Sequence, residues 1–233
     1  MTLKIRTLKF KMLIFRIFSS RTLFFRFCFV LILGGCLIGR FAGMPSMARA
    51  EETHTKILFL GDSITAGLGV ELENAYPALV DDRLNEKGIR VTITNGSISG
   101  STTAGALSRL KWFLRAKPDI LVLALGANDG LRGLSTREMS QNLERTIVLA
   151  KENGIRVILA GMQIPPNYGQ AYSKAFREVF ASLADRYDLS FIPFLLKAVA
   201  GNPLLNQADG IHPNRAGHKI IAETVFPYIQ AQL

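Results

Sequence analysis

The segment Ile120–Leu125 is apolar at all six of its positions and constrains the fold more than any other feature of the chain. A strand with one face in water alternates apolar and polar residues, whereas a strand covered on both faces is apolar throughout. Further apolar, β-branched-rich segments occur at 56–60, 90–94, 157–160 and 189–192. Ile120–Leu125 therefore predicts the centre of a parallel sheet that has helices on both faces.

Stretches with a helical spacing of apolar residues separate these predicted strands. They cover residues 76–87, 104–115, 136–153 and 171–187, and a last one follows the fifth strand at 214–232. Strands that alternate with helices of this length are typical of βαβ units. We therefore expect a single α/β domain, a three-layer α/β/α sandwich around a five-stranded parallel sheet of the flavodoxin-like type.

The first fifty residues differ in composition from the rest of the chain. They hold nine of the 28 Lys and Arg residues and none of the 18 Asp and Glu residues, so the remaining 19 basic residues nearly balance the acidic ones. Nine of the ten net positive charges thus belong to this leader, and the net charge gives no support to nucleic-acid binding. Residues 51–233 are enough for one domain with a sizeable core.

The leader, residues 1–50, indicates export from the cytoplasm, to the periplasm or outside the cell. Residues 27–39 form an uncharged, mostly apolar stretch, shorter than the roughly 20 residues of a membrane-spanning helix. Ala48-Arg49-Ala50 supplies small residues for signal-peptide cleavage before Glu51. Two alternatives stay open, an uncleaved membrane anchor and lipid attachment at Cys36, and membrane contact is expected only through the leader.

Both cysteines, Cys28 and Cys36, lie in the leader. A chain that begins at Glu51 therefore has no disulfide, no catalytic thiolate and no cysteine-based metal site.

Residues able to perform acyl transfer follow the first and last predicted strands. Ser63 follows the first strand, and Asp209 and His212 follow the fifth, so all three are expected at one edge of the sheet. An Asp-x-x-His turn can bring the carboxylate to Nδ1 of the ring, which leaves Nε2 to accept a hydroxyl proton. Alternatively, Ser63 only caps a helix that begins near Ile64, and His212 only stabilises its own turn.

Two further residues offer hydrogen-bond donors for a negatively charged oxygen at the same edge. Asn128 follows the central strand and can point its amide into the crevice, or it can simply form a turn. Gly100, which follows the second strand, can expose its backbone amide to a substrate oxygen, or it can relieve backbone strain. The Ser63 amide near a helix N-terminus is a third donor of this kind.

From Lys56 to its end, the chain resembles the SGNH (GDSL) hydrolase family. The resemblance rests on five segments: Gly61-Asp62-Ser63-Ile64-Thr65-Ala66-Gly67, Asn95-Gly96-Ser97-Ile98-Ser99-Gly100, Gly126-Ala127-Asn128-Asp129-Gly130-Leu131-Arg132-Gly133, Pro166-Asn167-Tyr168-Gly169 and Asp209-Gly210-Ile211-His212-Pro213-Asn214. It is strongest for small bacterial lipolytic esterases of the arylesterase, thioesterase and lysophospholipase type.

This resemblance implies a serine esterase that forms an acyl-enzyme. Ser63 is then the nucleophile, His212 the base and Asp209 its orienting partner. The Ser63 and Gly100 amides and the Asn128 side chain form the oxyanion hole, and no metal or organic cofactor is expected.

The implied substrates are small carboxylic esters or lipids, including acyl thioesters and lysophospholipids. Alternatives are a carbohydrate O-deacetylase of the same family, a non-catalytic binding module, and a membrane-anchored interaction protein. Four apolar residues on the predicted site loops either contact the acyl group or pack within the loops; they are Leu131, Leu134, Ile164 and Tyr168.

Overall fold

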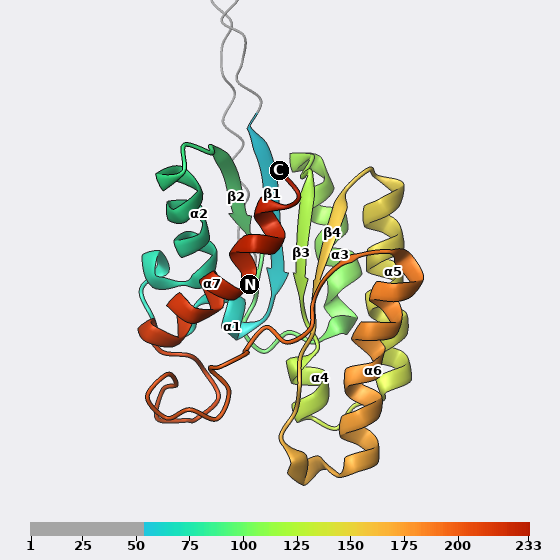
Figure 1. Cartoon of the computed structure of the whole chain (residues 1–233). Helices are drawn as coiled ribbons and strands as arrows, with labels where there is room; N and C mark the ends of the chain where they lie inside the picture. Colours follow the sequence, from blue (N-terminus) through green and yellow to red (C-terminus); the bar gives the residue numbers. More distant parts are fainter. Residues whose placement is uncertain (1–53) are drawn as a thin grey trace, which may run out of the picture. The chain divides into compact units, whose positions relative to one another are not determined.

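A computed structural model describes residues 54–233, which form a five-stranded sheet between two layers of helices (Figure 1). Every neighbouring pair of strands is parallel, and the order across the sheet is β2-β1-β3-β4-β5. This is the flavodoxin-like order, so the predicted fold class is confirmed. The strands are β1 (Thr55–Gly61), β2 (Val91–Asn95), β3 (Ile120–Ala124), β4 (Arg156–Ala160) and β5 (Ser190–Ile192).

The long helices divide between the two faces of the sheet, as right-handed crossovers require. One layer holds α2 (Tyr76–Glu86) and α7 (Arg215–Gln230), which pack on each other. The other layer holds α3 (Ala106–Phe113), α5 (Thr136–Glu152) and α6 (Gln170–Tyr187), as Figure 1 shows. The short helices α1 (Ser63–Ala66) and α4 (Ala127–Leu131) follow β1 and β3 directly.

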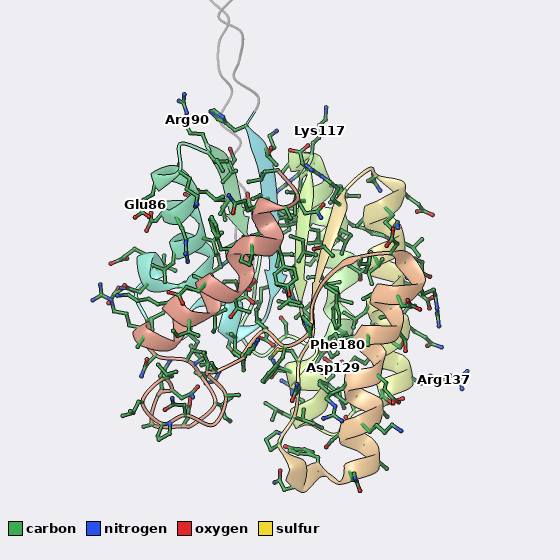
Figure 2. All side chains as sticks on the ribbon, viewed as in Figure 1. Glu86, Arg90, Lys117, Asp129, Arg137 and Phe180 are labelled. Carbon is green, nitrogen blue, oxygen red and sulfur yellow. The ribbon has the colours of Figure 1, made fainter. Side chains whose placement is uncertain are left out.

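The hydrophobic core lies on both sides of the central strands. Every residue of β3 is buried, as its uninterrupted apolar sequence predicts, and β1 is buried from Ile57 onward. On α6, Phe176 and Phe180 face inward and stack edge to face with their ring centroids 5.5 Å apart. In Figure 2, the Phe180 side chain lies inside the molecule, whereas the charged Arg137 points away from it.

The predicted helix at 104–115 differs from the structure, which divides it into three pieces. A 3₁₀ turn at Thr103–Gly105 leads into α3, and another at Leu114–Ala116 ends it. Lys117 then adopts a left-handed conformation with φ of 51°, which stops the helix before β3. Two more 3₁₀ turns occur at Leu72–Asn74 and Pro166–Tyr168, the second inside a predicted loop.

The order of the strands reverses between β1 and β3, because the chain moves to β2 on one side and to β3 on the other. Ligands of open α/β sheets bind beyond the carboxyl ends of the strands at such a point. Gly61 makes the tight turn from β1 into α1 possible, since a Cβ there would lie 2.1 Å from the Thr65 hydroxyl and 3.1 Å from the Ala124 carbonyl oxygen. Helices α1 and α4 therefore begin directly beyond the carboxyl ends of β1 and β3, at the switch point.

Candidate active site

A chain of short hydrogen bonds joins residues from the two ends of the described fold. The Ser63 hydroxyl lies 2.8 Å from Nε2 of His212, and Nδ1 of the same ring lies 2.7 Å from Oδ2 of Asp209. Ser63 and His212 are 149 positions apart in the sequence. The fold thus brings together the three residues that the sequence singled out for acyl transfer, in the order hydroxyl, imidazole and carboxylate.

The Asp209–His212 turn holds its own carboxylate in place. Oδ1 of Asp209 accepts the backbone amides of Ile211, at 2.9 Å, and His212, at 3.0 Å, while Oδ2 faces the ring. Gly210 supplies the left-handed conformation that this turn needs, with φ of 68°. The His212 amide, the His212 ring and the Ile211 amide hold the pKa of Asp209 at about 2, so the carboxylate is ionised at every pH where the protein would work.

Gln207 connects this turn to the loop that follows α1. Its side-chain amide donates to the Leu68 carbonyl at 2.6 Å and to the Pro213 carbonyl at 3.0 Å, and its backbone amide donates to His212. Gln207 could not be found from the sequence, because nothing in the local sequence marks a bond between residues 139 positions apart. Gln207 therefore fixes the distance between the serine and histidine loops.

Ser63 is the first residue of α1 and its side chain is almost buried, with 8% of the residue exposed. The amides of a first helical turn have no partner within the helix, so the Ser63 amide is available as a donor to another group. Asp62, not Ser63, caps this helix: Oδ1 of Asp62 accepts the Ile64 amide at 3.1 Å. The hydroxyl of Ser63 is thereby left to His212.

Asn128 and Gly100 lie beyond the carboxyl ends of β3 and β2, the two strands that flank β1. Asn128 is the second residue of α4, and its amide nitrogen lies 3.4 Å from Oδ2 of Asp62. Gly100 has φ of 76°, which favours glycine, and its carbonyl accepts the Arg132 guanidinium at 2.9 Å. That bond ties the Gly100 loop to the residues that follow α4.

Two further side chains anchor the loop that carries Gly100. Arg109 of α3 donates to the Gly61 carbonyl at 2.9 Å and to the Ser101 hydroxyl at 2.7 Å, so it joins the ends of β1 and of the Gly100 loop. Asp129 is buried and accepts both the amide and the hydroxyl of Thr103, at 2.9 and 2.6 Å. Neither role could be predicted from the sequence, because each residue acts on a loop remote in sequence.

Asp62 is a buried carboxyl beside the candidate nucleophile. Only 2% of the residue is exposed, and this burial raises the pKa of Asp62 to about 6. The Ile64 amide, the nearby His212 ring and the Asn128 amide act in the opposite direction and limit the rise. In the sequence, Asp62 stands out only as a member of the segment from Gly61 to Gly67, and its burial could not be inferred from that segment.

The four apolar residues predicted to contact substrate have different surroundings. Ile164 belongs to the hydrophobic core and is 9% exposed, and the Tyr168 hydroxyl donates to the Leu131 carbonyl at 2.8 Å. Leu134 is 40% exposed. Acyl contact by these four residues stays a prediction, and packing accounts for the position of Ile164.

Among residues 54–233, no group of three His, Cys, Asp or Glu side chains is arranged to hold a metal ion. What the site offers is acid–base and hydrogen-bonding chemistry: a hydroxyl on an imidazole, an ionised carboxylate behind it, and amide donors on the adjacent loops.

Several proteins are similar to this chain in sequence or in structure. The chain is 39% identical over 180 residues to an arylesterase of Vibrio mimicus, which covers 77% of this chain and 90% of the relative. It is 35% identical over 183 residues to thioesterase 1/protease 1/lysophospholipase L1 of Escherichia coli K12, with 78% and 86% covered. A crystal structure of TesA, 39% identical, superposes with a TM-score of 0.74 over 77% of this chain and 100% of that one.

Residues 59–220 also match the model of the GDSL-like lipase/acylhydrolase family. This stretch runs from the end of β1 into α7 and includes Ser63, Gly100, Asn128, Asp209 and His212. The chain therefore belongs to the GDSL-like lipase/acylhydrolase family.

Proposed function

We propose that this protein is a serine esterase that hydrolyses carboxylic esters through an acyl-enzyme. The observation that carries the proposal is the unbroken chain of hydrogen bonds from the Ser63 hydroxyl through the His212 ring to the Asp209 carboxylate. A serine hydroxyl becomes nucleophilic when an adjacent base takes its proton and a third group fixes the orientation of that base.

In the first half-reaction, the Ser63 oxygen attacks the carbonyl carbon of the ester while Nε2 of His212 accepts the hydroxyl proton. Asp209 accepts a hydrogen bond from Nδ1 and stabilises the imidazolium that forms. His212 then donates its proton to the leaving alcohol or thiol, and the acyl group stays on Ser63. In the second half-reaction, water attacks the acyl-enzyme by the same route and releases the carboxylic acid.

The oxyanion of each tetrahedral intermediate needs preorganised donors. We assign this role to the Ser63 amide at the start of α1, the Gly100 amide and the Asn128 side chain. Support comes from their placement after β1, β2 and β3, three parallel strands whose carboxyl ends lie at one edge of the sheet, and from the bonds that tie the Gly100 loop to Arg132 and Arg109.

The substrate class follows from the relatives. An arylesterase and a thioesterase/lysophospholipase at 35–39% identity support aryl and acyl esters, acyl thioesters and lysophospholipids as substrates. Exposed Leu134 and half-buried Leu131 and Tyr168 remain the proposed acyl contacts, and Ile164 would act from beneath them.

The test is hydrolysis of p-nitrophenyl butyrate by the variant Ser63→Ala. We expect a folded protein with kcat/KM reduced at least ~10³-fold, because the nucleophile is lost. Ser182→Ala, which removes an exposed hydroxyl from α6, is the matched control and should behave as wild type. Wild-type turnover by Ser63→Ala would reject the proposed function.

We also propose that residues 1–50 are an export leader and residues 51–233 the hydrolase domain, so the enzyme works in the periplasm or outside the cell. The leader lies outside the described residues, and the support is its composition: a basic start, an apolar stretch at 27–39 and small residues at 48–50. Among the helices of residues 54–233, none is long and apolar enough to span a membrane.

A further inference from the structure

The Asp62 carboxylate accepts two hydrogen bonds, one on each of its oxygens. Oδ1 accepts the Ile64 amide and caps α1, whereas Oδ2 accepts the side-chain amide of Asn128 across the site. The first bond explains an Asp, Asn or Ser at this position, because all of these cap helices well. The second bond requires an acceptor that faces Asn128, and only the carboxylate supplies one in addition to the cap.

An asparagine side chain carries two N–H donors on one side and an oxygen acceptor on the other. An ionised carboxylate accepts hydrogen bonds and cannot donate them. Asp62 therefore holds the NH₂ group of Asn128 on the side of the nucleophile. One N–H is engaged by Asp62, and the second remains for an oxygen bound beside Ser63.

We propose that Asp62 is a positioning residue that fixes the orientation of the Asn128 amide, so that this amide presents a donor and not its oxygen to the reacting carbonyl. The proposal rests on the proposed function, since it assigns the task to a hydrolytic site. It gives a reason why a carboxylate is kept almost fully buried next to the nucleophile, at an energetic cost that a neutral cap would avoid.

The charged and titratable groups around Asp62 are consistent with an ionised carboxylate during turnover. His212 faces it from the loop before α7, Arg109 from α3 and Tyr76 from α2. Burial raises the pKa of Asp62 to about 6, so above that pH it accepts from Asn128. Below it, the protonated group can donate to the Asn128 oxygen, and the amide can turn its NH₂ group away.

Asp62→Asn tests the proposal directly. The substituted side chain keeps an oxygen for the Ile64 amide, but its NH₂ group then faces the NH₂ group of Asn128. Two opposed donors drive the Asn128 amide to rotate and present its oxygen to the oxyanion. We expect kcat for p-nitrophenyl butyrate to fall about 10- to 100-fold, with KM nearly unchanged, because the lost interaction forms only in the transition state.

A double-mutant cycle separates this role from others. In the Asn128→Ala background, Asp62→Asn should lower kcat less than about twofold, because the residue through which Asp62 acts is gone. An equal loss in both backgrounds would overturn the proposal, since Asp62 would then act on His212 or on the fold. Asp62→Ser keeps the helix cap without the second acceptor. It should also lose kcat, and wild-type kcat in Asp62→Ser would contradict the account.

Stability measurements and a control complete the test. Because the substitution removes a buried charge, Asp62→Asn should unfold at the same temperature as wild type or higher at about pH 8. A lower unfolding temperature together with lost kcat would indicate a structural role and overturn the proposal. Asp82→Asn, an exposed change on α2, should leave kcat and unfolding unchanged. Failure of the proposed function would show separately, as full activity in Ser63→Ala.

Discussion

Two buried titratable side chains beneath the site make the free energy of unfolding change with pH in opposite directions. Asp62 has its pKa raised by burial from 3.8 to about 6, and His218, with none of its surface exposed, has its pKa lowered by burial from 6.5 to about 4. His218 stacks on Tyr76 and accepts the Tyr76 amide on Nδ1 at 3.3 Å. Its Nε2 has no hydrogen-bond partner among the described residues, so the neutral ring is buried without a bond on that side.

The signs of these two contributions follow from linkage. Folded Asp62 binds its proton more tightly than the unfolded chain does, so its contribution to stability is present below pH ~4 and is lost as the pH rises to about 6. Folded His218 binds its proton less tightly, so its contribution is present above pH ~6.5 and is lost as the pH falls to about 4. Over this interval the two largely cancel in the wild-type protein.

Substitution of either residue should reveal the contribution of the other to the pH dependence of the free energy of unfolding. Relative to wild type, the unfolding free energy of Asp62→Asn should rise by roughly 3 kcal/mol between about pH 4 and pH 6.5, because about two pKa units are involved. That of His218→Phe should fall by a similar amount over the same interval. Urea unfolding at several pH values measures both, and parallel curves for the two variants and wild type would contradict the assignment.

The sequence predicts some residues of the site far better than others. Ser63, Asp209 and His212 can be found because a short local pattern carries each of them, and the structure joins them by hydrogen bonds. Gln207 and Arg109 cannot be found in this way. Their importance lies in bonds to backbone carbonyls 139 and 48 positions away, which no local pattern encodes.

At the scale of elements, the last helix is positioned by one side chain. Oδ1 of Asn214 accepts the amides of Ala216 and Gly217 at 2.9 and 3.1 Å and thereby caps α7. Its Nδ2 donates to the Leu204 carbonyl at 2.9 Å. Asn214 thus joins the start of α7 to the loop that carries His212.

Asn214→Ala should lower the free energy of unfolding by about 1 to 2 kcal/mol, since the helix cap and a loop bond are lost together. Asn153→Ala is the control. Asn153 follows the last residue of α5, and its side-chain amide donates to the Leu149 carbonyl within the last turn of that helix. Urea unfolding measures the difference between the two variants. Equal stability of Asn214→Ala and wild type would show that the cap contributes nothing.

The strands and the long helices could be predicted from the sequence, but α4 could not, and α1 was expected only as a helix that begins near Ile64. The all-apolar β3 and the helices α5 and α6 lie within one or two residues of the predicted segments, because their apolar periodicity extends over several turns or a whole strand. The short helices α1 and α4 contain four and five residues, too few to show a period. They are nonetheless the elements that carry Ser63 and Asn128.

At the scale of the whole molecule, the topology of the sheet accounts for the site. The loops after β1 and β3 diverge at the switch point, and the loop after β5 returns to it, because α7 packs back over the sheet beside α2 (Figure 1). Residues from positions 63 to 212 thereby meet without any long-range pattern in the sequence. The fold class determines the edge of the sheet at which the site forms, and the hydrogen bonds between loops determine the distances between the site residues.

The proposed division into leader and hydrolase domain also concerns the whole chain. Expression of the full chain in a bacterial host should yield an exported product whose first residue is Glu51, because the small residues at 48–50 fit signal-peptide cleavage. Amino-terminal sequencing of the periplasmic fraction measures this. A product that retains the leader in the membrane, or carries lipid on Cys36, would contradict cleavage after Ala50.

The central claim is that His212 activates Ser63 as the nucleophile, and covalent labelling with a fluorophosphonate tests it most directly. The probe reacts with an activated serine, so mass spectrometry of the labelled protein should place one adduct on Ser63. The rate of labelling should fall at least ~10²-fold in His212→Ala, because the base is removed. An adduct on another serine, or equally rapid labelling without the histidine, would contradict the account.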